Sequence, residues 1–203
     1  SVGGASLVSI SLGSDDPDRA VNIFRQSVCT LMIIGALFSL VGAAFAGDIA
    51  SALGATGRLR LPAAEYMRYY IVFTVPVLLA MALSTFIRHD GSPRLSMRSM
   101  LWGAMTNILL DYLFVFPLKM GLKGAAIATG LGQLVTVLAC MRHFVERRGV
   151  LTIGCVRIRA RDIKAIVRLG IPSFLAEVSY SVLMYMHNIE IACRIGEIGV
   201  TAY

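Results

Sequence analysis

An aspartate stands inside an apolar stretch of the chain, in "NILLDYLFVF" at residues 107–116. Between Ser99 and Leu118 the one charged side chain is Asp111. A carboxylate at such a depth in a bilayer is costly, so it usually faces a bundle interior or a water-filled cavity and marks a functional site. Asn107 lies four residues earlier, on the same face of a helix. These two side chains could therefore bind a proton or a cation.

A hydroxyl group is expected at the same depth. If the chain turns near Met120, Asp111 lies nine residues before the turn and Thr129 nine after it. At 1.5 Å per residue, both lie about 13 Å from the turn. Ala125, one helical turn nearer the loop, adds little more than backbone. Carboxylate, amide and hydroxyl oxygens suit Na⁺, but a structural hydrogen-bond cluster that joins two helices is equally consistent with the spacing.

A second carboxylate, Glu177, lies in the apolar segment "GIPSFLAEVSYS". Tyr180 and Asn188 follow it and make this segment unusually polar for a helix that faces lipid. We interpret Glu177, Tyr180 and Asn188 as a candidate wall of a substrate cavity that attracts cations. For Glu177 itself, extension to the cytoplasmic membrane interface is slightly favoured over the cavity role, because Glu177 is only nine residues beyond Arg168.

The composition is that of an integral membrane protein: 57% of the residues are hydrophobic and 15% are charged. Charge-poor runs of a length that crosses about 30 Å of hydrocarbon predict five spanning helices. They cover residues 26–47, 69–87, 99–118, 124–141 and 169–189. Residues 1–13 resemble the end of a sixth. Because the first residue is Ser1, we expect the chain to be an internal piece of a longer protein.

Positive charge is concentrated on one side of this predicted bundle. Successive loops lie on opposite sides of a membrane. When the loops of each side are counted together, 13 of the 19 Lys and Arg residues lie on the side of the 142–168 loop. Cytoplasmic loops carry such an excess, so this loop is expected in the cytoplasm. The net charge of +7 therefore reflects membrane topology, and nucleic-acid binding is not expected.

The sequence shows no catalytic or cofactor constellation. The four cysteines have no CxxC spacing and are expected to be free thiols. The histidines are scattered, and His89 and His143, near predicted helix ends, are expected to be solvated. An intramembrane enzyme would need a nucleophile with a base, a metal cluster or an aspartate pair. The sequence pattern contains none of these, so an intramembrane enzyme is the least favoured function.

Two further patterns concern helix packing. Gly124, Ala128 and Gly132 recur at four-residue spacing and form a small-residue stripe, which allows close helix approach in lipid. The expected partner is the preceding helix of the hairpin. Pro76 lies near the centre of another span, where it removes a backbone hydrogen bond and predicts a kink that is either a hinge or a fixed bend.

Several motifs together resemble one family. "FIRHDGSPRLSM", "GAMTNILLDYLFVF" and "GLKGAAIATGLGQ" resemble the multidrug and toxic compound extrusion (MATE) transporters. "LGSDDPDRA" and "LRLPAAEYMRYY" stand in the expected order. The resemblance covers essentially the whole chain, which looks like the end of the second helix through the seventh helix of that family.

The resemblance implies a multi-span all-α membrane fold with two six-helix lobes around a central cavity. Residues 1–145 would belong to the N-terminal lobe, 146–164 to a cytoplasmic linker, and 165–203 to the first helix of the C-terminal lobe. Such proteins export cationic or amphipathic drugs across the plasma membrane in exchange for H⁺ or Na⁺ and need no other cofactor. The family's first helix, which often contributes an acid to the cation site, would lie outside this chain.

The resemblance also implies roles for particular residues. The fifth-helix asparagine and aspartate of the family match Asn107 and Asp111, its sixth-helix threonine matches Thr129, and the small residue one turn earlier matches Ala125. An alternative function in the same superfamily is a flippase for lipid-linked sugars. A cavity for pyrophosphate would be expected to contain several cationic residues, whereas these spans are almost free of Lys and Arg.

Overall fold

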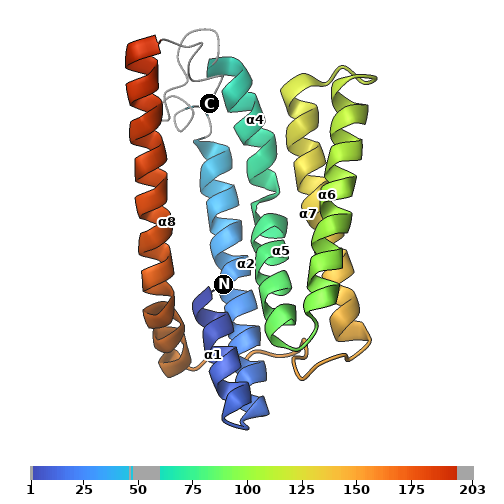
Figure 1. Cartoon of the computed structure of the whole chain (residues 1–203), viewed down its shortest axis with the longest axis vertical. Helices are drawn as coiled ribbons and strands as arrows, with labels where there is room; N and C mark the ends of the chain where they lie inside the picture. Colours follow the sequence, from blue (N-terminus) through green and yellow to red (C-terminus); the bar gives the residue numbers. More distant parts are fainter. Residues whose placement is uncertain (1, 46, 48–59, 196–203) are drawn as a thin grey trace.

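The computed structural model describes residues 2–45, 47 and 60–195, excluding the side chains at 60–64, 188 and 191–195. This part of the chain is all-helical, as predicted. Figure 1 shows α8 along one side of an elongated bundle, the α6–α7 hairpin along the other, and the remaining helices between them. The helices are α1 Val2–Gly13, α2 Pro17–Ala44, α4 Arg60–Val72, α5 Thr74–His89, α6 Pro93–Val115, α7 Gly121–Val145 and α8 Ala160–Ile195.

Three described helices are long and apolar enough to cross a membrane: α2, α7 and the 160–187 part of α8. The pair α4 and α5, bent by 51° at a short break, forms a fourth span if it is counted as one. The remaining predicted span, 99–118, corresponds to α6, which is 23 residues long but less apolar than the other spans. Arg94 and Arg98 in its first turns, and Asn107 and Asp111 further along, account for that difference.

Local sequence explains where α2 begins. Asp16 is the N-cap and accepts a hydrogen bond from the backbone N–H of Arg19, at 3.1 Å. Pro17 occupies the first helical position, where a missing N–H costs nothing, and Asp18 places a negative charge near the positive end of the helix dipole. The "SDDPDRA" segment therefore starts the helix as the turn residues predict.

The last helix begins earlier than its apolar run predicts. The run covers 169–189, whereas α8 starts at Ala160. In its first turns Asp162 is buried and Ile166 packs against the hydrophobic core, while Lys164 is exposed. A charged segment can continue a helix when one face packs and the other is solvated, so counting charges alone places the start of this helix too late.

The predicted kink is confirmed, but it lies before Pro76 rather than at it. Helix α4 ends at Val72 and α5 begins at Thr74, so Pro76 falls in the first turn of α5. The proline ring excludes the carbonyl four residues earlier, so the regular ladder stops there. The carbonyl of Ile71 accepts hydrogen bonds from the hydroxyls of Thr74 (2.7 Å) and Ser39 (2.6 Å). These bonds satisfy a backbone group that lipid could not.

The main hydrophobic core lies at one end of the bundle. Phe24 of α2 stacks on Phe144 of α7 at 5.2 Å between ring centroids and meets Phe86 of α5 edge-on at 5.1 Å. Helix α1 packs here, and its Gly3 faces Gly170 of α8 so closely that a Cβ at Gly3 would lie 2.7 Å from the Gly170 nitrogen. This contact joins α8 to the rest of the bundle.

A buried hydrogen-bond network lies at the same end of the bundle. Asp90, in the turn between α5 and α6, bonds through Oδ2 to Nε2 of His143 at 2.8 Å. Its carboxylate also accepts from the backbone N–H groups of Val150 (2.9 Å) and Leu151 (3.1 Å). The expectation that His143 is solvated is wrong, because the side chain is fully buried. His89 is exposed, as expected, and bonds Ser9.

Candidate cation site between α6 and α7

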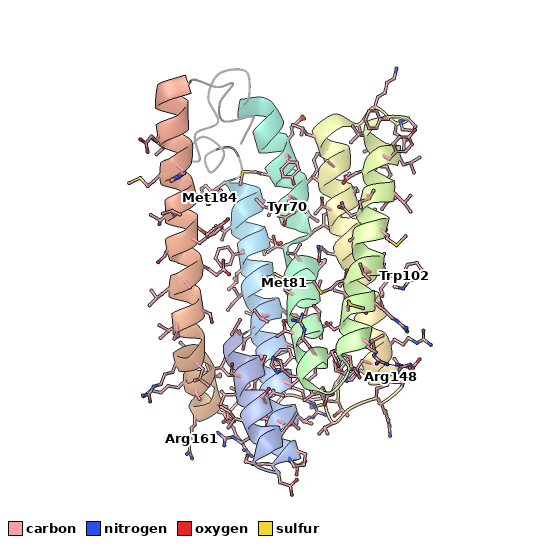
Figure 2. All side chains as sticks on the ribbon, in the orientation of Figure 1. Tyr70, Met81, Trp102, Arg148, Arg161 and Met184 are labelled. Atoms are coloured by element: carbon pink, nitrogen blue, oxygen red, sulfur yellow. The ribbon has the colours of Figure 1, made fainter. Side chains whose placement is uncertain are left out.

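The polar face of α6 points toward α7. Ser99 and Gly103 are buried, and Asn107 and Asp111 continue the same four-residue series as half-buried residues. The opposite side of the helix is exposed and apolar, and Figure 2 shows Trp102 pointing away from the bundle. The prediction that Asn107 and Asp111 share a helix face toward the bundle is confirmed.

The small-residue stripe of α7 is the surface that α6 contacts. Gly124, Ala128 and Gly132 are all buried. A Cβ at Gly132 would lie 2.8 Å from the Gly103 oxygen and 2.9 Å from the Cβ of Asn107. The two backbones approach this closely because the stripe carries no larger side chain. The predicted hairpin contact is confirmed, and it brings the polar residues of both helices together.

One hydrogen-bond chain connects the two helices at this depth. The side-chain amide of Asn107 donates to the hydroxyl of Thr129 at 3.4 Å. That hydroxyl in turn donates to the backbone carbonyl of Ala125 at 2.9 Å. The structure thus brings Asn107, Thr129 and Ala125 together, as the depth calculation predicts. Asp111 lies one helical turn along α6 from Asn107.

Asp111 itself differs from its neighbours. Its Oδ1 atom is buried and has no hydrogen-bond partner within the described part of the chain. Buried polar side-chain atoms normally have a hydrogen-bond partner, so the unpartnered oxygen of Asp111 is the unusual feature of this site.

A cavity of about 310 Å³ adjoins the Asn107–Thr129 contact. It lies between α5, α6 and α7, and Gln133 and Thr136 of α7 contribute polar groups to its wall. Met81 of α5, which is labelled in Figure 2, is another lining residue. Sequence reasoning missed Gln133, although its position four residues after Thr129 places it on the same face. No lining residue of this cavity is charged.

Metal clusters of the usual kind do not occur in the described residues, where no group of three or more His, Cys, Asp and Glu side chains could hold a metal ion. Within the described residues, Asp111 is the carboxylate that lies one helical turn from the neutral oxygens of Asn107 and Thr129.

The candidate substrate-cavity residues lie on a separate helix. Glu177 and Tyr180 of α8 are exposed, and the helices that α8 contacts within the described structure are α1 and α2. The side chain of Asn188 lies outside the described part of the chain. The structure therefore does not bring these residues to Asp111, and their role as a cavity wall stays a prediction.

Comparison with known proteins identifies relatives over the whole chain. A family model described as MatE matches residues 1–113. The multidrug export protein MepA of Staphylococcus haemolyticus is 28% identical over 206 residues, covering 100% of this chain and 45% of that protein. MepA of Staphylococcus aureus (strain bovine RF122 / ET3-1) is 25% identical over 204 residues, with the same coverage.

Solved structures agree with the helical arrangement. An inward-facing multidrug resistance MATE family transporter of the MOP superfamily superposes with a TM-score of 0.90 at 28% identity, covering 98% of this chain and 46% of that one. A MOP superfamily transporter from Pyrococcus furiosus gives a TM-score of 0.87 at 28% identity, covering 98% of this chain and 45% of that one. The chain thus spans about 45% of the length of the relatives that it matches.

The architecture matches the region of MATE structures that corresponds to the N-terminal lobe. MATE proteins are multi-pass membrane transporters rather than enzymes, so the intramembrane enzyme is excluded. Since the family model matches more than half of the residues and the helices superpose closely on solved members, this chain belongs to the MATE family of transporters.

Proposed function

We propose that this chain forms most of the N-terminal lobe, and the first helix of the C-terminal lobe, of a secondary antiporter in the plasma membrane. The antiporter exports cationic or amphipathic drugs in exchange for H⁺ or Na⁺. The names of the relatives support drug export. Their lengths, about twice that of this chain, support activity in a two-lobed protein. In this arrangement the 146–159 segment links the lobes on the cytoplasmic side.

The single observation that carries the coupling role is the unpartnered Oδ1 atom of Asp111. In a purely structural cluster, buried carboxylate oxygens are normally hydrogen-bonded, as they are at Asp90. Near Asp111, one N–H of the Asn107 amide donates to the Thr129 hydroxyl and that hydroxyl donates to the Ala125 carbonyl, so neither bond reaches Oδ1 of Asp111. A bound proton or Na⁺ supplies the missing partner.

The residues around Asp111 have separate roles in this proposal. Asp111 provides the charge that holds the coupling ion. Asn107 keeps its Oδ1 as a ligand while its Nδ2 bonds Thr129, and the Thr129 hydroxyl oxygen completes the set. The small face of α7 holds both helices at a fixed separation. Coupling then requires that the ion binds one conformation more tightly than the other, since only differential affinity shifts an equilibrium.

The drug pathway is proposed to include the exposed face of α8. Glu177 attracts cationic drugs, and Tyr180 and Asn188 line the same wall. A flippase for lipid-linked sugars is less well supported, because the cavity beside Asn107 has no Lys or Arg in its lining.

The deciding experiment uses Asp111→Asn in the complete transporter. Asparagine keeps the shape of the side chain but removes the charge and the exchangeable proton. We expect normal insertion and folding, and loss of gradient-driven dye efflux from vesicles under an imposed H⁺ or Na⁺ gradient. Efflux is normalised to folded protein, and Asp15→Asn, an exposed change, is the matched control. Near-normal efflux by Asp111→Asn would show that Asp111 is not the coupling residue.

A further inference from the structure

A cavity of about 810 Å³ lies away from the candidate cation site. It is bounded by the first turns of α2 and by the linker that precedes α8. Neither the apolar runs that predict the spanning helices nor the proposed coupling role of Asp111 explains this cavity. Its charged lining residues are Asp16, Asp18, Arg19, Arg25, Arg157 and Arg159.

Hydrogen bonds from α2 fix the linker wall of this cavity. The guanidinium group of Arg25 donates to the carbonyl of Thr152 at 2.8 Å, to the Thr152 hydroxyl at 2.9 Å and to the carbonyl of Cys155 at 3.2 Å. These bonds join segments that are 127 and 130 residues apart in the sequence. The charge of Arg25 is thus used to hold the wall in place.

The backbone of Arg157 is held on both sides. Its N–H donates to the side-chain oxygen of Asn22 at 3.3 Å, and its carbonyl accepts from Nε2 of Gln26 at 2.6 Å. Gln26 is almost fully buried. Arg157 therefore lines the cavity from a fixed backbone position rather than from a loosely attached loop.

The cavity keeps uncompensated positive charge. Within the described structure, the guanidinium groups of Arg157 and Arg159 form no hydrogen bond or ion pair. Arg19 is 3.9 Å from Asp162. Of the two lining carboxylates, Asp16 caps α2 and Asp18 is exposed. The guanidinium groups of Arg157 and Arg159 are thus free, whereas Asp18 is the one lining carboxylate that does not cap a helix. The lining of the cavity therefore carries an excess of positive charge.

A smaller adjoining cavity of about 290 Å³ extends this basic surface toward α8. It is lined by Arg19, Arg159, Arg161 and Asp162. Figure 2 shows Arg161 at the lower end of α8, at the same end of the bundle as the start of α2. The two cavities share Arg19 and Arg159, so a bound anion could contact arginines from both.

The cavity lies beside the first residues of α2, and the position of these residues in the sequence indicates how deep in the membrane the cavity lies. The charge-poor run that enters the hydrocarbon starts at Gln26, immediately after Arg25. Residues 16–25 therefore lie at the level of the lipid headgroups, where basic pockets beside spanning helices bind phosphate-bearing headgroups. Arginine suits this ligand because its planar fork binds phosphate oxygens in pairs.

We infer that the cavity between the start of α2 and the 150–159 linker is a binding site for a phosphate group, carried by an anionic lipid or by a free anion. Arg157 and Arg159 bind the phosphate directly, Arg19 contributes from α2, and Arg25 positions the linker wall. The inference is independent of the coupling role of Asp111.

The test measures binding of three probes to the complete transporter in neutral detergent: short-chain phosphatidylglycerol, short-chain phosphatidylcholine and inorganic phosphate. We expect phosphatidylglycerol to bind at least about tenfold more tightly than phosphatidylcholine. The double change Arg157→Gln and Arg159→Gln should weaken phosphatidylglycerol binding about tenfold or more. The matched control, Arg94→Gln with Arg98→Gln, removes two exposed arginines of α6 outside the cavity and should change binding less than twofold.

A second variant strengthens the site instead of weakening it. Asp18→Asn removes the free carboxylate from the cavity, so phosphatidylglycerol should bind severalfold more tightly, a result that unfolding cannot produce. Competition by millimolar inorganic phosphate identifies a free anion as a ligand, and lack of competition identifies the lipid; both outcomes support the site. Equal losses in the two arginine pairs, equal affinity for the two lipids, or no gain with Asp18→Asn would overturn it.

Discussion

The side-chain amide of Asn107 donates to the hydroxyl of Thr129 across 3.4 Å, and this bond connects α6 to α7 next to the unpartnered carboxylate oxygen of Asp111. The bond is long for an N–H to O contact. In the proposed site, these partners would separate to contact an ion at Asp111.

Thr129 gives a test of the ligand set that is separate from Asp111. Thr129→Val keeps the shape of the side chain and removes the hydroxyl, whereas Thr129→Ser keeps the hydroxyl. We expect Val to weaken the coupling ion's apparent affinity by roughly tenfold, about the free energy of one hydrogen bond, and Ser to change it little. The measurement is efflux rate against Na⁺ or H⁺ concentration. Equal behaviour of the two variants would remove Thr129 from the site.

The hairpin contact predicts a sharp size limit on α7. Ala128 is fully buried against its neighbours, so Ala128→Leu should destabilise the protein by about 2 kcal/mol through overpacking. The matched control is Ala36→Leu on the exposed side of α2, which should have little effect. Thermal unfolding in detergent measures both, and similar midpoints for the two variants would contradict close packing at Ala128.

The buried Asp90 carboxylate should be a major stabilising group at its end of the bundle. Asp90→Asn replaces one acceptor oxygen by an NH2 group, which then faces either the Val150 N–H or the Leu151 N–H and the His143 ring. Loss of a charge-assisted hydrogen bond and one unpaired donor should cost about 3 kcal/mol. Asp15→Asn, at an exposed position with positive φ that asparagine tolerates, is the control. Chemical unfolding compares them, and a loss below about 1 kcal/mol at Asp90 would show that the network contributes little.

Membrane orientation can be measured with single cysteines. Cys155 is exposed in the linker, and Leu118 is exposed in the α6–α7 turn. With the other native cysteines replaced, we expect an impermeant maleimide added to intact cells to label Leu118→Cys and to spare Cys155. Permeabilised cells should give labelling of both. Labelling of Cys155 from outside with protection of position 118 would reverse the proposed topology.

Periodicity along a single helix was enough to predict much of this protein. Four-residue spacing placed Asn107 and Asp111 on one face and identified the stripe of Gly124, Ala128 and Gly132, because side chains on a helix repeat every 3.6 residues. Apolar run lengths predicted the helices, and counting residues from the turn matched the depth of Thr129 to the polar face of α6. These features depend on local geometry, which a sequence contains directly.

The tertiary structure decided which distant groups meet. His143 bonds Asp90, and Arg25 bonds the linker at Thr152 and Cys155. Both contacts join segments that are far apart in the chain. The bend falls at Phe73 rather than at Pro76, because the proline ring excludes the carbonyl four residues earlier, and Ser39 of another helix donates to the Ile71 carbonyl beside the break. Periodicity gives a residue's face and depth, but not the identity of its partner. Partners are set by how whole helices pack, which depends on the fit of many side chains at once.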